Sequence, residues 1–217
     1  MSRFLRSRPA DQRGFTTVEL AVAVGLLSLV MAVIYGAMIS ATRAVDGANQ
    51  RLNNLSEARL VIDTATKDMR TATRLTASGS AFVTAKDNEV IFYGNLNPTL
   101  GPKKIRIYVD SNTQFVEEIT DPDSTSVAPN YTYNLNSPRR RFVGRYVANP
   151  ASAPIFTYLD AAGNTLSPTP LTAAQMLQVR SVGIRLMIRK STVLKLAATT
   201  VVSQVRLPNL SYTAVVN

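Results

Sequence analysis

The sequence predicts an α+β protein in which a long N-terminal helix precedes a headpiece built on a mainly antiparallel β-sheet. Two observations predict this class. No proline interrupts residues 15–75, and apolar residues recur there at helical spacing, so one helix of about sixty residues is expected. After residue 78 the apolar period changes to two, as in strands that bury one face. A long helix followed by a run of strands is the pattern of α+β proteins.

Four segments are expected along the chain. Residues 1–14 form a basic leader, residues 15–40 the transmembrane part of the helix, residues 41–77 its amphipathic part, and residues 78–217 the β-rich headpiece. The twenty residues from Leu20 to Ile39 carry no charge, and about 20 helical residues span the roughly 30 Å of bilayer hydrocarbon. The arginines of the leader predict, by the positive-inside rule, a single-pass protein of the cytoplasmic membrane with its headpiece outside the cytoplasm.

The amphipathic part of the helix is predicted to lay one apolar stripe on the sheet. Arg59 and Thr66 interrupt this stripe, which consists of Val45, Ala48, Leu52, Leu55, Ile62, Met69 and Ala72. Enrichment in β-branched and aromatic residues then predicts strands. These are expected at residues 89–93, 104–109, 113–119, 142–147, 155–159, 179–189 and 199–207, with a short one at 131–135 and a helical turn at 171–177.

Composition excludes several kinds of chemistry. The 217 residues include no cysteine and no histidine, so a disulfide, a histidine–cysteine zinc site and a Ser-His-Asp triad are all ruled out. No nucleophile elbow or phosphate loop is present either, and we expect no enzyme, no cofactor and no metal. Four acids, Glu117, Glu118, Asp121 and Asp123, offer oxygen ligands to calcium, but their spacing matches no calcium loop.

A lone carboxylate marks the start of the apolar segment. Glu19 follows Gly14 and Phe15 by a few residues, and an acid inside a membrane-length helix is costly and functional by default. A conventional signal peptide has a shorter apolar region and a small-residue cleavage site after it. A plain signal anchor fits the length of the segment but explains neither Gly14 nor Glu19.

The run Gly14-Phe15-Thr16-Thr17-Val18-Glu19-Leu20 resembles the cleavage and methylation motif of type IV pilins and type II secretion pseudopilins. The resemblance implies that a prepilin peptidase cuts between Gly14 and Phe15 and N-methylates Phe15. It also implies that Glu19 sets assembly register by pairing with the N-terminal amine of a neighbouring subunit; the alternative is that Glu19 only caps the helix. Residues 58–63 and 67–72 are similar to the helix of J-type minor pseudopilins, and residues 155–160, 179–186 and 205–210 to minor pilin-like proteins.

The net charge of +10 leaves a basic excess outside the leader. Its densest cluster is Arg139, Arg140 and Arg141, near the aromatic residues Tyr131, Tyr133, Phe142 and Tyr146. Such a cluster can contact an anionic partner such as DNA. A solvated loop flanking strands, in a secreted domain with arginine-rich strands, is the favoured interpretation.

The expected function is therefore that of a minor pilin or pseudopilin, a structural subunit that helps to initiate or cap a type IV pilus or a type II secretion pseudopilus. Its expected partners are the prepilin peptidase, other major and minor pilins or pseudopilins, the inner-membrane assembly platform, and membrane lipid before it enters a cell-surface or periplasmic filament. One alternative is a DNA-uptake pseudopilin that contacts DNA. Another is a signal-anchored protein with a ligand- or nucleic-acid-binding domain that does not polymerise.

Overall fold

A computed structural model describes residues 16–97, 101–134, 136–190 and 197–211. The chain divides into two compact units, residues 1–46 and residues 47–217. We describe each unit by itself. Gly14 and Phe15, two residues of the predicted cleavage motif, lie outside the described residues.

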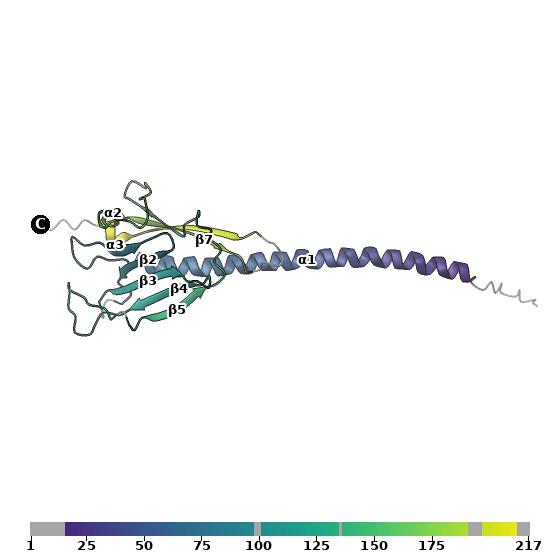
Figure 1. Cartoon of the computed structure of the whole chain (residues 1–217), viewed down its shortest axis with the longest axis horizontal. Helices are drawn as coiled ribbons and strands as arrows, with labels where there is room; N and C mark the ends of the chain where they lie inside the picture. The colour runs from purple at the N-terminus through teal and green to yellow at the C-terminus, as the bar shows by residue number, and fades with distance from the viewer. Residues whose placement is uncertain (1–15, 98–100, 135, 191–196, 212–217) are drawn as a thin grey trace, which may run out of the picture. The chain divides into compact units, whose positions relative to one another are not determined.

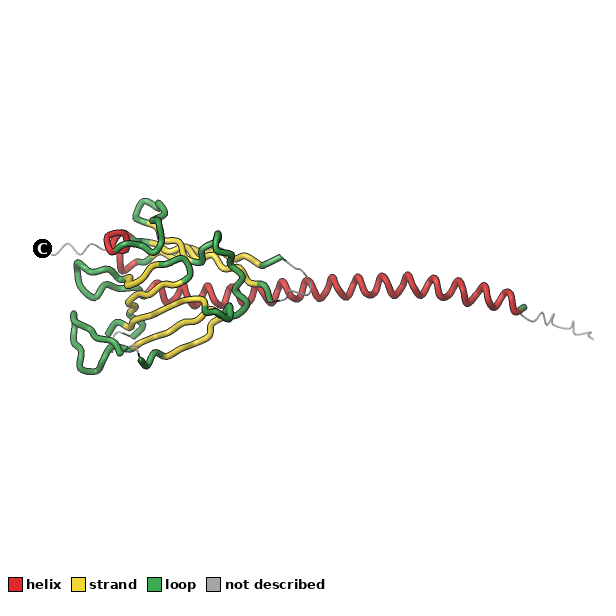
Figure 2. The backbone as a smooth tube through the Cα atoms, in the orientation of Figure 1, coloured by secondary structure: helices red, strands yellow, loops and turns green. Residues whose placement is uncertain are grey.

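The long helix predicted from the sequence is present as α1, Thr17–Arg70, which contains 54 residues (Figures 1 and 2). Without a proline, every interior backbone N–H can be used in the helix. Lys67 and Arg70 lie in its last turn, where positive charge interacts favourably with the helix dipole. The helix ends at Arg70, a few residues earlier than expected.

The first sheet is antiparallel and follows chain order (Figure 1). Its strands are β1 (Phe82–Ala85), β2 (Glu89–Gly94), β3 (Lys103–Val109), β4 (Phe115–Thr120) and β5 (Arg139–Gly144). In β2 and β3, side chains alternate between buried and half-buried, as the period of two predicted. Each strand pairs with the next in sequence, so the sheet is a simple meander.

The second sheet contains β6 (Phe156–Leu159), β7 (Ser181–Ile188) and β8 (Thr199–Arg206), also antiparallel. The predicted alternation in β7 is confirmed, since its buried side includes Val182, Ile184, Leu186 and Ile188, whereas Arg185 is exposed. The predicted helical turn is α2, Ala173–Gln178, which begins with a capping box between Thr172 and Gln175. A further short helix, α3, covers Pro208–Ser211.

One hydrophobic core joins both sheets to the second half of α1. Phe115 of β4 lies 6.4 Å from Phe156 of β6, and Phe82 of β1 lies 6.1 Å from Tyr158 of β6, measured between ring centroids. The helix contributes Ala58, Val61, Ile62, Ala65 and Met69. Tyr158 satisfies its polar end within this core, because its hydroxyl donates to the Lys86 carbonyl at 2.8 Å.

Gly144 allows α1 to approach the sheet closely. A Cβ atom built on Gly144 would lie 2.2 Å from Cγ2 of Val61, a buried residue of α1. No real Cβ contact is that short, so any side chain at this position would push the helix away from β5. Glycine therefore sets the spacing between helix and strand here.

The structure corrects several boundaries. Strand β1 was not predicted, and β5 begins at residue 139 instead of 142. No strand covers residues 131–134, where Tyr133 forms only an isolated bridge with Pro122, and residue 135 lies outside the described residues. The predicted apolar stripe is also wrong in part. Val45, Ala48 and Leu52 are exposed, whereas Thr66, taken as an interruption, is buried.

Candidate functional site

The start of α1 is fixed by a reciprocal hydrogen-bond pattern between Thr16 and Glu19. The Glu19 backbone N–H donates to Thr16 Oγ1 at 3.2 Å, and Glu19 Oε2 accepts from the Thr16 N–H and hydroxyl, each at 3.0 Å. This is a capping box, which satisfies backbone donors that have no partner inside the helix. Glu19 therefore caps the helix, a role that leaves open whether it also acts in assembly.

The apolar segment of the first unit is fully exposed. All of the residues from Leu20 to Ile39 are exposed and uncharged, and α1 is long and apolar enough here to cross a membrane. Leucine, isoleucine and valine side chains exposed in such a number have no counterpart on an ordinary water-soluble surface. This segment is thus available to contact lipid or other apolar helices.

The second half of α1 has two different sides. Residues buried against the sheets include Ala58, Val61 and Ala65, whereas Leu52 and Leu60 are 64% and 60% exposed. With 3.6 residues per turn, Leu52 and Leu60 lie on the side of the helix opposite to the buried residues. The sequence pattern assigned Leu52 to the sheet side. The structure leaves it exposed, together with Leu60, on the side of the helix that also carries Ser56 and Asp63; we call this side the outer helix face (Leu52 and Leu60).

The arginine cluster lies in a strand and not in a loop. Arg139, Arg140 and Arg141 open β5, and β5 pairs with the acid-bearing strand β4 in the register Glu117–Arg141 and Glu118–Arg140. The expectation of a loop is therefore wrong, whereas the expectation that these arginines are solvated is confirmed, because all three are exposed. Cross-strand pairs of opposite charge are favourable in a sheet, and they account for the arginines without an external anion.

All three guanidinium groups approach carboxylates of this chain. Arg139 Nη2 lies 3.8 Å from Asp121 Oδ1, and Lys103 shares the same carboxylate at 2.5 Å. Arg140 lies 3.6 Å from Asp110 and 3.8 Å from Glu118. Exposed pairs of this kind contribute little stability individually, roughly 0–1 kcal/mol. These ion pairs nevertheless offset the positive charge of the arginine cluster before any partner approaches.

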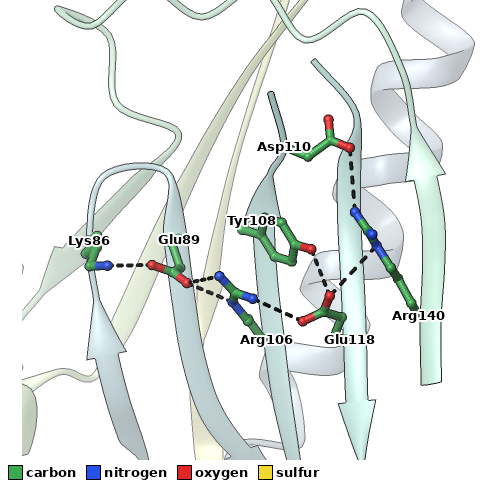
Figure 3. A network of polar contacts seen from close by, with 7 residues as sticks. All are labelled: Lys86, Glu89, Arg106, Tyr108, Asp110, Glu118 and Arg140. Atoms are coloured by element: carbon green, nitrogen blue, oxygen red, sulfur yellow. Dashed lines mark hydrogen bonds and ion pairs between the residues drawn. The ribbon is translucent and has the colours of Figure 1, made fainter. Parts of the chain in front are cut away.

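A chain of alternating charges crosses the outer side of the first sheet (Figure 3). Glu89 Oε2 lies 2.6 Å from Lys86 Nζ, and Glu89 Oε1 accepts from Arg106 Nε at 2.7 Å. Burial disfavours the charged form of Glu89, but the hydrogen bonds from Lys86 and Arg106 outweigh it and lower the pKa of this carboxyl group. Arg106 continues the chain to Glu118 Oε2 at 3.2 Å.

Tyr108 is enclosed by this network. Its hydroxyl donates to Glu118 Oε1 at 2.8 Å, and the Arg106 guanidinium lies 4.1 Å from the centre of its ring (Figure 3). Arg140 reaches the same carboxylate from β5. The network thus ties four neighbouring strands together through charge and one aromatic ring.

The remaining partner of the arginine cluster is buried between α1 and the sheet. Arg141 Nε and Nη2 each lie 2.7 Å from Glu117 Oε2, and the carboxyl group of Asp68 on α1 is close enough to interact with that of Glu117. Only 6% of Asp68 and 1% of Glu117 is exposed. Two buried carboxyl groups and one arginine balance only if one carboxyl keeps its proton. We call this set the acid pair (Asp68 and Glu117).

Burial, together with hydrogen bonding and charge from the adjacent Glu117, raises the pKa of Asp68 to about 8, against the opposing effect of Arg141 and Lys67. Asp68 Oδ2 and Glu117 Oε1 have no donor among the described residues, as expected for two carboxyl groups that share a proton. Sequence reasoning placed Asp68 among the polar residues of the helix. No pattern in the sequence distinguishes it from exposed Asp63.

The four acids considered for calcium do not converge. Glu117 faces α1, Glu118 faces the opposite side of the sheet, and Asp121 pairs with Lys103. Within the described part of the chain, no group of three acidic side chains is placed to hold a metal ion. Glu117, Glu118 and Asp121 instead form ion pairs with arginines and lysines of the same sheet.

The acid pair predicts how stability depends on pH. Because the pKa of Asp68 is raised from 3.8 to about 8 on folding, the folded state binds a proton that the unfolded state has lost. This contribution to stability is complete below about pH 4 and is lost as pH rises through about 8, by about 1.4 kcal/mol per pH unit between these values. Asp68→Asn supplies a permanent donor to Glu117 and should remove this slope.

The measurement is the free energy of unfolding by urea, for the full chain in zwitterionic micelles, at several pH values between about 5 and 8. Asp63→Asn, at an exposed position of the same helix, is the matched control and should retain the wild-type slope. A slope in Asp68→Asn equal to that of the wild type would show that no proton is held between the two carboxyl groups.

Comparison with known proteins does not assign the chain to a family. No protein-family model matches the sequence, and no curated protein is significantly similar to it.

Proposed function

We propose that this protein is a minor pilin or pseudopilin, a membrane-anchored structural subunit that joins a filament after its leader is removed. The observation that carries the proposal is the division of α1. Residues Leu20 to Ile39 form an exposed, uncharged helical segment, and the second half of the same helix is an integral part of the headpiece core. A subunit that must leave the bilayer and pack its helix against other helices requires both properties.

The outer helix face supports the same proposal. Leu52 and Leu60 lie beyond the apolar segment along the chain and are not needed for the headpiece core. Apolar side chains that a fold leaves exposed on one side of a helix are typical of helix–helix contacts. In the proposed filament, this face contacts neighbouring subunits once the apolar segment has left the lipid.

The proposed partners follow from this assembly. They are a prepilin peptidase, other pilins or pseudopilins and an inner-membrane assembly platform, with the headpiece on the outer side of the cytoplasmic membrane. A DNA-contacting role through Arg139, Arg140 and Arg141 receives less support, because acids of the first sheet already pair with all three. A signal-anchored protein that does not polymerise remains the competing function, and N-terminal processing distinguishes it.

Processing at Gly14 is the first test. In cells with the native assembly system, the mature N-terminal peptide should begin at Phe15 and carry one added methyl group. Gly14→Val should retain the leader, because a branched side chain at this position hinders entry of the extended backbone into a protease cleft. Mass spectrometry of the N-terminal peptide measures both outcomes.

Gly25→Val is the matched control for this experiment. A Cβ atom at Gly25 meets nothing within 4 Å, so the substitution should leave cleavage unchanged. An uncleaved N-terminus in the wild type, or cleavage beyond Ile39, would contradict the proposal and favour a signal anchor or a secreted domain.

The two roles of Glu19 can be separated by a pair of variants. Glu19→Gln keeps an oxygen that accepts the capping hydrogen bonds but removes the charge. Thr16→Ala removes the capping partner, at a cost of about 1 kcal/mol, but keeps the carboxylate. If the charge of Glu19 acts in assembly, Glu19→Gln should be processed but absent from filaments, and Thr16→Ala should assemble.

The readout is the amount of each variant in sheared or purified filaments relative to the membrane fraction. The opposite result, with Glu19→Gln present at wild-type level and Thr16→Ala lost, would show that Glu19 is required only as a helix cap.

A further inference from the structure

Charge is distributed unequally between the two sheets. The acids of the first sheet pair with its arginines and lysines, as described above. From residue 143 to the end of the sequence, Asp160 is the only acid, although the same stretch contains Arg145, Arg180, Arg185, Arg189, Lys190, Lys195 and Arg206. Among the described residues, Arg180, Arg185 and Arg206 form no ion pair, so the second sheet and its flanking residues carry positive charge that no described acid neutralises.

Part of this charge surrounds a hollow at the end of the second sheet. The hollow has a volume of about 690 Å³, and its lining includes the turn Asp160–Gly163 together with Arg180, Ser181, Gln204 and Arg206. Ser181 of β7 and Arg206 of β8 are directly opposite in the strand register. The strand pairing thus places a hydroxyl and a guanidinium beside each other.

Two of the donors in the hollow, Arg180 and Ser181, are held in place by hydrogen bonds within the fold. Arg180 Nη1 donates to the carbonyls of Leu177 and Val179 at 2.8 and 3.0 Å, which fixes the guanidinium near the end of α2. Ser181 is buried, and its Oγ accepts from Gln204 Nε2 at 3.1 Å, so its own O–H remains available to donate. Arg206 is exposed and has no ion pair or side-chain hydrogen bond among the described residues.

Asp160, the acid in the lining, already accepts hydrogen bonds from its own turn. Asp160 Oδ1 accepts from the backbone N–H groups of Ala162 and Asn164, each at 2.9 Å, and Oδ2 accepts from Asn164 Nδ2 at 3.2 Å. The hydrogen bonds from Asn164, followed by that from Ala162, lower the pKa of Asp160, so it stays charged. Asp160 forms no ion pair with Arg180 or Arg206. Its negative charge repels an anion in the hollow, but its side chain does not fill the hollow.

We propose that this hollow binds a carboxylate group presented by an acidic segment of a partner protein. Planar guanidinium groups and a hydroxyl donor match the geometry of a carboxylate. Nucleic acid is less well matched, because the aromatic residues of this sheet, Phe156 and Tyr158, are buried and offer no stacking surface. In the proposed function the partner is a neighbouring filament subunit, and in that respect the inference rests on the proposed function.

The test is direct binding of a fluorescein-labelled octaglutamate peptide to the full chain in phosphatidylcholine nanodiscs, followed by fluorescence anisotropy at low salt. Arg206→Gln should weaken binding about tenfold, the effect of losing one charge-assisted contact. The substitution removes no ion pair or side-chain hydrogen bond among the described residues, so the variant should remain folded. Arg145→Gln, an equal change of charge at an exposed residue outside the hollow, is the control and should bind like the wild type.

Asp160→Asn provides an independent test of opposite sign. The amide oxygen of asparagine can still accept the two backbone hydrogen bonds of the turn, but the negative charge is gone. Binding of the octaglutamate peptide should become tighter. Binding that stays unchanged would show that the peptide does not enter the hollow.

Three further results would overturn the proposal. They are the absence of binding to octaglutamate, an equal loss of affinity in Arg145→Gln and Arg206→Gln, and tighter, Arg206-dependent binding of octathymidylate, which would indicate a nucleic acid. N-terminal processing is not involved in this assay. If binding fails but cleavage at Gly14 is normal, only the proposal that the hollow binds an acidic partner is rejected. If cleavage is lost but binding is normal, only the proposal of a filament subunit is rejected.

Discussion

The packing of one side of α1 against both sheets is the interaction on which the rest of this structure depends. Ala58, Val61 and Ala65 are small enough to bring the helix close to the strands, and Gly144 allows β5 to meet Val61. Burying this side uses only part of the helix surface. Leu52 and Leu60 stay exposed, and the uncharged segment from Leu20 to Ile39 has no partner in its own unit. The fold thus leaves apolar helix surface for contacts with other molecules.

The packing of α1 against the sheet also determines which charged groups are buried together, as the acid pair shows. Asp68 belongs to α1 and Glu117 to β4, so closing the helix onto the sheet brings two carboxyl groups together beside Arg141. A buried pair of like charges would oppose docking, whereas a shared proton and one arginine make it neutral. The docked helix is consequently sensitive to pH between about 4 and 8.

Much of the architecture could be predicted from the sequence, because it depends on local signals. The absence of proline and the apolar run indicated α1, and alternation indicated β2, β3, β7 and β8. The charged residues were harder to place. Arg139, Arg140 and Arg141 resemble a solvated loop in sequence, and their position in β5 depends on pairing with acids that are distant in the chain. Periodicity likewise could not show that Leu52 is exposed and Asp68 buried, since both depend on which side of α1 meets the sheets.

The central claim is that the outer helix face contacts other subunits. It is tested most directly by cross-linking in cells from an introduced cysteine, which is the single thiol of the protein because the natural chain has no cysteine. Leu52→Cys should form covalent adducts with other subunits when the native assembly system is present, whereas Ala58→Cys, at a buried position of the same helix, should form none. Leu52→Cys protein that is leader-processed but remains monomeric under oxidising and cross-linking conditions would contradict the account.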